Sequence, residues 1–196
     1  MRKEMSLLKK HVESVVGKAD WSGKSLEYSA FFELKMFKKK ELLMSAGERN
    51  FPLFFVSSGC LHMYFESEKG SKQTVQMAIE NWWLTDVMAF VKNRSADFSI
   101  QAVTPVTVLC ISKENYDRLL ETYSDWNHYF RKVFEIAYGA SLLRMKYQYA
   151  YTKEERYRYF IAQYPEFEQR VPQYLLASFL GITPEYISEL RAKIRS

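Results

Sequence analysis

The spacing of apolar residues changes along the chain, from a period of two to a period near 3.6. Between about residues 52 and 111 lie five short, β-rich apolar runs, "PLFFVSS", "CLHMYFES", "KQTVQMAI", "FSIQAV" and "VTVLCI". In the second run Leu61, Met63 and Phe65 alternate with more polar neighbours, which is the pattern of a half-buried strand. "SEKGSK" follows with glycine near its centre and indicates a hairpin. Several short, evenly spaced strands predict a small antiparallel sandwich or barrel.

Apolar residues at helical spacing occur on both sides of this β-rich part of the sequence. An amphipathic helix is expected over about residues 4–16, and a shorter one through "YSAFFEL". After Ser112, a fair N-cap, apolar residues at helical spacing predict a long helix over about 113–146, with a possible break near Ser124. Its aromatic stripe can pack on its own domain. The alternative is that part of the stripe seals a homodimer, because the run is too long for a small barrel to cover.

The last fifty residues read as a small helical unit, 147–196, beside the larger part, 1–146. Thr152 and Glu155 form a capping-box pattern, and Pro165 marks the end of the helix that they begin. "YPEFEQRVP" reads as a connector. A terminal pair of helices is then predicted, with Gly181 at the turn between them. Thr183 and Pro184 supply the cap and the first residue of the second helix.

Composition and charge restrict the class of protein. No apolar run approaches the roughly 20 residues that span a bilayer, and no secretory signal is recognisable, so the expected location is the cytoplasm with no membrane contact. The net charge of +5 hints at a polyanionic partner. However, residues 147–196 hold 7 Lys and Arg against 6 Asp and Glu, so the terminal unit carries little of the excess. Two cysteines and three scattered histidines predict neither a metal site nor a cofactor.

The terminal helices carry a recognisable skeleton, A-x-x-x-G-[IV]-[ST]-x-x-x-[IV]-S, from Ala177 to Ser188. With the β-rich part, the long helix and "WW" before an acidic residue, residues 25–196 resemble the Crp/Fnr superfamily of transcription regulators. The resemblance implies an α+β fold. Its parts would be an antiparallel, jelly-roll-like β-roll of the cyclic-nucleotide-binding type as sensor, a long central dimerisation helix, and a small C-terminal helix-turn-helix domain that binds double-stranded DNA.

The resemblance also places the DNA contacts, at the first exposed turn of the second terminal helix. A carboxylate such as Glu185 can accept a hydrogen bond from cytosine N4. Glu189 departs from related sequences, which commonly have Arg at this position, and an acid there repels phosphates. Arg191 and Lys193 would then supply phosphate contacts, helped by neutral donors such as Gln173. The candidate DNA-contacting residues are Gln173, Thr183, Pro184, Glu185, Tyr186, Ser188, Glu189, Arg191 and Lys193.

In the sensor part, the resemblance places a cyclic-nucleotide cassette over "TDVMAFVKNRSADFSIQA". Asp86 takes the acidic position, but Ala96 stands where relatives have the phosphate-binding Arg. The sequence therefore argues against cyclic AMP or cyclic GMP, and leaves an unknown small-molecule effector or an empty scaffold. An alternative reading makes the tryptophans core residues and Asp86 a helix cap. The tentative pocket residues are Trp83, Thr85, Asp86, Arg94 and Asp97.

Three functions follow, from different classes. The first is a homodimeric transcription regulator that reads a pseudo-palindromic site. The second is a small-molecule sensor or scaffold with a vestigial helix-turn-helix, which accounts better for Glu189. An enzyme ranks last, because the sequence has no glycine-rich phosphate loop, no metal-ligand cluster and no nucleophile–base pair.

Overall fold

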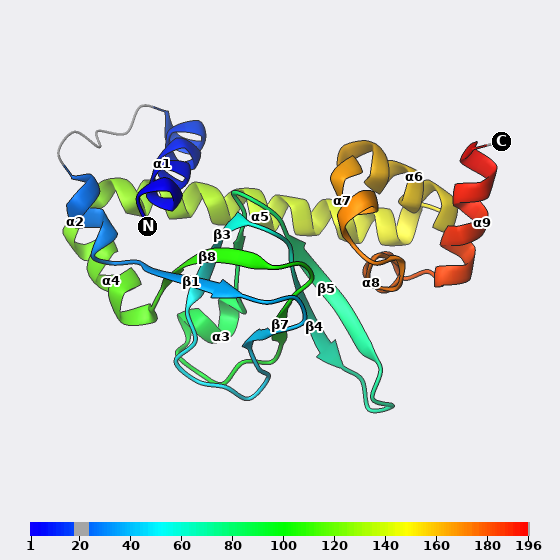
Figure 1. Cartoon of the computed structure of the whole chain (residues 1–196), viewed down its shortest axis with the longest axis horizontal. Helices are drawn as coiled ribbons and strands as arrows, with labels where there is room; N and C mark the ends of the chain where they lie inside the picture. The colour runs from blue at the N-terminus through cyan, green and yellow to red at the C-terminus, as the bar shows by residue number, and fades with distance from the viewer. Residues whose placement is uncertain (18–23, 196) are drawn as a thin grey trace.

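The computed structural model describes residues 1–17 and 24–195 and shows an α+β fold arranged along one long helix (Figure 1). This helix, α5 (Ser124–Ala150), runs from the N-terminal helices at one end to the C-terminal helices at the other. The β-roll lies against its middle. The fold expected from the sequence, with antiparallel sheets, a long helix and terminal helices, is confirmed.

The β-roll consists of two four-stranded antiparallel sheets with strand orders β1-β8-β3-β6 and β2-β7-β4-β5. The five strands expected from the apolar runs are all present, and three further strands, β1, β2 and β6, join them. A single buried cluster fills the space between the sheets, and includes Phe54, Val108 and Ile100. The strands are β1 (Glu33–Phe37), β2 (Leu42–Met44), β3 (Leu53–Ser58), β4 (Leu61–Glu66), β5 (Lys72–Ala78), β6 (Trp83–Leu84), β7 (Ser99–Ala102) and β8 (Val106–Ile111).

Strand β4 does not show the alternation of buried and exposed residues that its sequence predicted. His62 and Tyr64 are buried together with Leu61 and Met63, whereas Phe65, near the end of the strand, is 38% exposed. The His62 ring stacks on Tyr64 and lies 3.3 Å from the Thr74 hydroxyl oxygen. Consecutive residues of this strand are buried, so both of its faces are covered. His62 tolerates burial because neighbouring side chains form hydrogen bonds with its ring nitrogens.

The N-terminal helices pack against one end of the long helix. α1 (Arg2–Val16) covers β3 and α5 with a fully buried apolar face that includes Leu8 and Val12. α2 (Ser25–Ser29) ends before "FFEL", where the sequence had predicted continued helix, and Glu33 instead begins β1. The expected break before α5 also exists, because α4 (Lys113–Thr122) ends at Thr122 and the extended residue Tyr123 separates it from Ser124.

A buried hydrogen-bond chain ties α1 to the β-roll and to α5. Trp83 Nε1 donates to the Tyr129 hydroxyl over 2.7 Å, and this hydroxyl lies 2.7 Å from His11 Nδ1. The tyrosine hydroxyl accepts from the indole and can donate its one proton to Nδ1 when that nitrogen is unprotonated. Burial lowers the pKa of His11, which favours the neutral ring in this arrangement.

Acidification is expected to destabilise the fold through His62, which is buried, and His11, which is partly buried. Burial lowers the pKa of His11 and of His62, so the unfolded chain binds protons more readily than the folded one. Their contribution is complete above the ordinary pKa of about 6.5 and is lost as the pH falls below it. Urea midpoints at about pH 7.5 and pH 5.5 measure the effect, which His11→Gln should reduce and the exposed His128→Gln should leave unchanged. Equal midpoints at both pH values would contradict this prediction.

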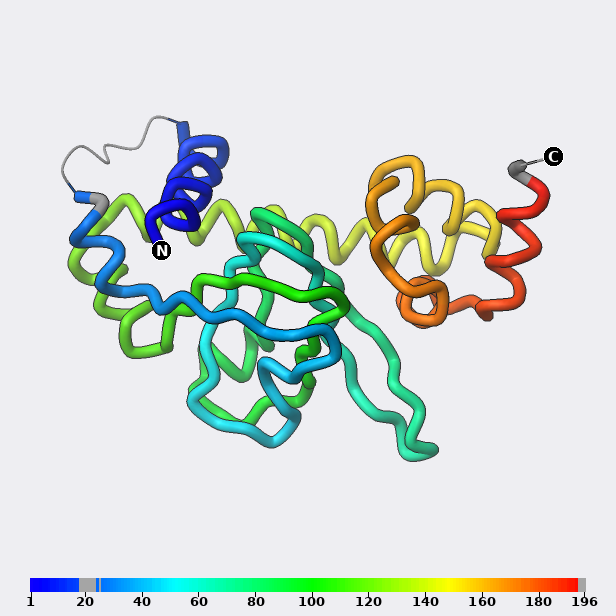
Figure 2. Tube along the Cα trace, in the orientation of Figure 1, coloured from blue at the N-terminus to red at the C-terminus, as the bar shows by residue number. Residues whose placement is uncertain are grey.

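The four C-terminal helices follow α5 at the far end of the molecule, with the β4–β5 hairpin projecting beside them (Figure 2). α6 (Lys153–Gln163) begins with the predicted capping box of Thr152 and Glu155. The expected connector instead forms a short helix, α7 (Pro165–Arg170). Gly181, in the left-handed conformation with φ 67°, joins α8 (Gln173–Leu180) to α9 (Pro184–Arg195). Glycine takes this conformation without strain.

Candidate nucleic-acid interface and sensor pocket

The terminal helix pair is attached directly to the β-roll through α8. β5 is an edge strand, so its outer backbone groups need partners from outside the sheet. The Ser178 hydroxyl oxygen accepts a hydrogen bond from the Thr74 N–H over 2.9 Å and lies 3.3 Å from the Lys72 carbonyl, to which it donates. One hydroxyl on α8 thus replaces part of a missing neighbouring strand.

Arg144 of α5 adds a second connection to the same strand edge. The pairing of β4 with β5 is irregular opposite Met63 and Tyr64, where Val75 is an extra residue. The Arg144 guanidinium donates to the Val75 carbonyl and lies 4.5 Å from the ring centroid of Phe179. Burial lowers the pKa of Arg144. This residue therefore joins the long helix, the sheet edge and α8 at one point.

An ion pair makes a further contact between the terminal helices and the β-roll, beside the contact of α8 with β5, which we call the dock. Arg170 of α7 donates to both carboxylate oxygens of Glu80, over 2.7 and 2.8 Å, and to the Gly59 carbonyl over 2.9 Å. Glu80 also accepts the Gly59 N–H over 2.7 Å. Burial alone would raise the pKa of Glu80, but the bonds from Arg170 and the Gly59 backbone outweigh it and lower the pKa. A Cβ on Gly59 would lie 2.3 Å from the Pro105 carbonyl oxygen, so this loop requires glycine.

Apolar side chains from both parts of the chain form one cluster beneath these polar contacts. Met77 and Ile79 of the β-roll share it with Phe167, Leu176 and Ile187 of the terminal helices. Trp82, the first residue of the "WW" pair, packs against this cluster and against the core of the β-roll. The terminal helices therefore rest on the β-roll through a continuous apolar contact.

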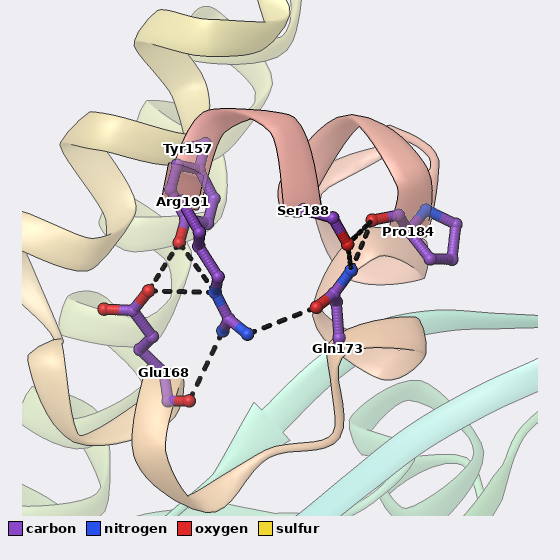
Figure 3. Close-up of polar contacts among 6 residues, drawn as sticks. All are labelled: Tyr157, Glu168, Gln173, Pro184, Ser188 and Arg191. Carbon is purple, nitrogen blue, oxygen red and sulfur yellow. Dashed lines mark hydrogen bonds and ion pairs between the residues drawn. The ribbon is translucent and has the colours of Figure 1, made fainter. Parts of the chain in front are cut away.

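Arg191, expected to contact phosphates, instead connects the terminal helices (Figure 3). Its Nε donates to Glu168 of α7 over 3.0 Å and to the Tyr157 hydroxyl of α6 over 3.2 Å. Its Nη1 donates to Gln173 Oε1 over 3.2 Å, and Gln173 in turn donates to the Ser188 hydroxyl over 2.6 Å. Arg191 and Gln173 therefore hold α9 against its neighbours.

The remaining candidate residues lie on or near the free side of α9. Ile187 and Leu190 are buried, whereas Thr183, Glu185, Ser188, Glu189 and Lys193 are exposed and Pro184 and Tyr186 are partly exposed. Thr183 caps the helix by accepting the Tyr186 N–H over 3.2 Å. Among the residues that the structure describes, neither Glu185 nor Glu189 belongs to an ion pair. The outer face of α9 is thus polar and predominantly acidic in its first turns.

The structure links three of the five tentative pocket residues, Asp86, Arg94 and Asp97, whereas Thr85 and Trp83 bond to residues outside this set. Asp86 is buried and caps α3 (Val87–Val91), with one oxygen accepting from the Ala89 N–H and the other from the Asp97 N–H. Arg94 forms a two-pronged pair with Asp97 at the surface, over 2.9 and 2.5 Å. Thr85 donates to the Pro52 carbonyl.

Trp83 belongs to the core cluster and gives its indole N–H to Tyr129. This placement corresponds to the alternative reading of the sequence, with Trp83 in the core and Asp86 as a helix cap. The Trp83 indole N–H and both carboxylate oxygens of Asp86 thus already have hydrogen-bond partners within the protein.

Sequence reasoning missed the residues that attach the helix pair to the β-roll, namely Ser178, Arg144, Arg170 and Glu80. Ser178 and Thr74 are 104 positions apart, so no local pattern links them. The one available signal was Arg170, a charged residue between the apolar Phe167 and Val171, where a buried partner could have been suspected.

Comparisons with known proteins agree with this architecture. Residues 34–123 match the family model of the cyclic nucleotide-binding domain, which places such a domain in the β-roll. No curated protein sequence matches the chain. No described helix combines the length and the apolar character needed to cross a membrane.

Solved structures resemble most of the chain. A CooA mutant from Carboxydothermus hydrogenoformans is 17% identical, with a TM-score of 0.71, over 94% of this chain and 84% of that one. FixK2 from Bradyrhizobium japonicum is 15% identical, with a TM-score of 0.69, over 84% of each chain. A protein assigned to the Crp/Fnr regulators, from Eubacterium rectale, is 14% identical, with a TM-score of 0.68, over 89% of this chain and 83% of that one. At these identities the likeness establishes a shared fold.

Proposed function

We propose that the protein is a DNA-binding transcription regulator of the Crp/Fnr type and not an enzyme. The observation that carries the proposal is the terminal helix pair. The turn at Gly181 and the Thr183 cap present the first turns of α9 to solvent, as a helix that enters a major groove requires. A solved structure with the same fold belongs to a protein assigned to the Crp/Fnr transcriptional regulators, which supports the proposal.

The proposed active form is a homodimer built along α5. Between residues 135 and 149 this helix leaves large apolar side chains exposed, with Ile136 at 62%, Leu143 at 50% and Met145 at 56%. A helix that is apolar on an exposed face usually has a partner. A two-fold dimer would present two copies of α9 to half-sites about one helical turn apart, so the operator would be pseudo-palindromic.

The β-roll is proposed to respond to an effector other than cyclic AMP, or to none. The position that relatives use for a phosphate-binding cation holds the buried Ala96, and the nearby Arg94 is paired with Asp97. A cyclic phosphate would need Arg94 to leave that pair. A signal at the β-roll would reach α9 through the dock at β5 and through α5, by favouring one of two arrangements of the subunits.

A second function, a sensor or scaffold with a vestigial helix pair, is favoured by one observation. Glu185 and Glu189 put negative charge on the face of α9 that would approach DNA phosphates. Selection of genomic fragments by the purified protein and by Glu189→Arg distinguishes the two functions. The regulator is expected to enrich a pseudo-palindromic sequence, and binding should weaken steeply with salt.

Glu189→Arg should bind random DNA more tightly and change the base preference at one position of each half-site, because Arg favours guanine where Glu favours cytosine. Enrichment by the variant alone would support the vestigial helix pair and overturn the regulator.

A further inference from the structure

A basic hollow lies where the β-roll meets the terminal helices. Lys72 and Gln73 of β5 form one wall, and Tyr174 and Ser178 of α8 form another. The turn before α9 and Lys153, the first residue of α6, complete it. Residues from the sensor half and from the helix pair therefore meet in one surface depression.

Both charged residues that line this hollow are lysines. Lys72 is held in place, with its Nζ 3.1 Å from the Tyr64 hydroxyl and 4.5 Å from the Tyr64 ring centroid. Its Nζ also forms an ion pair with Glu66 Oε1, 3.9 Å away, which is weak because both side chains are exposed to solvent. Lys153 is exposed and forms no ion pair among the described residues. The hollow thus concentrates positive charge.

Neutral donors complete the lining. Tyr174 is 58% exposed, so its hydroxyl is available to a ligand. Thr183 accepts the Tyr186 N–H, which leaves its own hydroxyl proton to donate outward. Two cations beside hydroxyl donors suit a phosphate group.

The position of the hollow indicates which phosphate it takes. It borders Pro184, where α9 begins, and the proposed function puts this end of α9 in a major groove flanked by backbone phosphates. The outer face of α9 attracts the backbone weakly, because Glu185 and Glu189 offset the exposed Lys193 and Arg191 is engaged internally. Cations from β5 and α6 would offset this deficit.

We propose that the hollow binds a backbone phosphate of the bound duplex, with Lys72 of the sensor domain and Lys153 as its two cations. This inference rests on the proposed function. It adds that the β-roll itself forms part of the DNA interface. Since Ser178 fixes α8 to β5, a movement of the β-roll that broke this dock would also dismantle a DNA contact.

The test compares the salt dependence of DNA binding among lysine variants. Lys72→Gln and Lys153→Gln each remove one cation from the hollow, whereas Lys69→Gln removes the same charge from the hairpin tip, outside it. Fluorescence anisotropy with the selected duplex, over a series of KCl concentrations, gives the slope of log affinity against log salt. One neutralised phosphate contributes about 0.9 to this slope, so the double variant Lys72→Gln/Lys153→Gln should lower it by about 0.9 per subunit, and each single variant by part of that amount. Lys69→Gln should change it little, and Lys72→Arg should preserve it.

The same series with a random-sequence duplex separates the two proposals. Equal affinity for both duplexes, with slopes still reduced by Lys72→Gln and Lys153→Gln, would overturn selective reading and support the phosphate site. Indistinguishable slopes for Lys72→Gln, Lys153→Gln and Lys69→Gln would overturn the phosphate site alone, and no binding to either duplex would overturn both. Inorganic phosphate at constant ionic strength should displace the duplex from the parent more readily than from Lys72→Gln, because both would compete for the hollow. Phosphate that bound the parent without changing its affinity for the duplex would make the hollow a free-anion site, and the inference would fail. Unchanged thermal melting of each variant shows that the fold is intact.

Discussion

Phe167→Ala is expected to lower the free energy of unfolding by about 3–5 kcal/mol, the usual cost of removing a buried phenyl ring. Phe167 is 1% exposed in the cluster that the β-roll and the terminal helices share. Its ring centroid lies 5.4 Å from that of Phe160 and 6.0 Å from that of Trp82. Alanine would leave a cavity at the centre of this contact. The surrounding aromatic rings could fill it only by giving up their contacts with other residues of the cluster.

Because the cluster belongs to both parts of the chain, the loss should appear in both. Urea unfolding at one protein concentration, followed by far-UV circular dichroism and by tryptophan fluorescence, should give a single lowered midpoint with either signal. Phe65→Ala removes the same ring from a side chain that is 38% exposed and should cost far less. If the helical signal alone moved to lower urea, the terminal helices would be an independent unit and the shared core would carry no energetic weight.

The features that the sequence predicted well are those set by near neighbours in the chain. The Thr152 capping box and the Gly181 turn appear where expected because both depend on residues within four positions. The longer strands follow from runs of apolar residues that are buried between two sheets. β1 was missed because "FFEL" suits either helix or strand, and pairing with β8, over seventy residues later, decides the outcome.

The candidate site was predictable only in part. Its existence followed from the Ala177–Ser188 skeleton, but the role of Arg191 did not, because a cation on an exposed helix face can serve either a ligand or a neighbouring helix. Glu168 lies in a segment read as a connector, and its folding into α7 brings the carboxylate to Arg191. The basic hollow could not be foreseen at all, since Lys72 and Lys153 meet only through the dock of α8 on β5.

The largest expected effect on DNA affinity comes from preventing the proposed dimerisation through α5. The residues to change are Ile136 and Leu143. They are seven positions apart, so they lie on one side of the helix, as in a coiled-coil seam. Replacing both with Glu would place like charges on each side of the proposed two-fold axis. The expected result is a monomer in multi-angle light scattering, with the fold retained, because both side chains are largely exposed within one subunit.

Loss of the dimer should then weaken binding to the selected duplex by about 10²–10⁴-fold, because the second half-site is no longer engaged by a linked copy of α9. Leu26→Glu provides the control, since Leu26 is 82% exposed and belongs to α2, which lies at the end of α5 far from the C-terminal helices in Figure 1, and it should leave both mass and affinity unchanged. A double variant that remained dimeric would place the interface elsewhere. A monomer that kept full affinity would show that one copy of α9 suffices, and the two-fold reading of DNA would have to be abandoned.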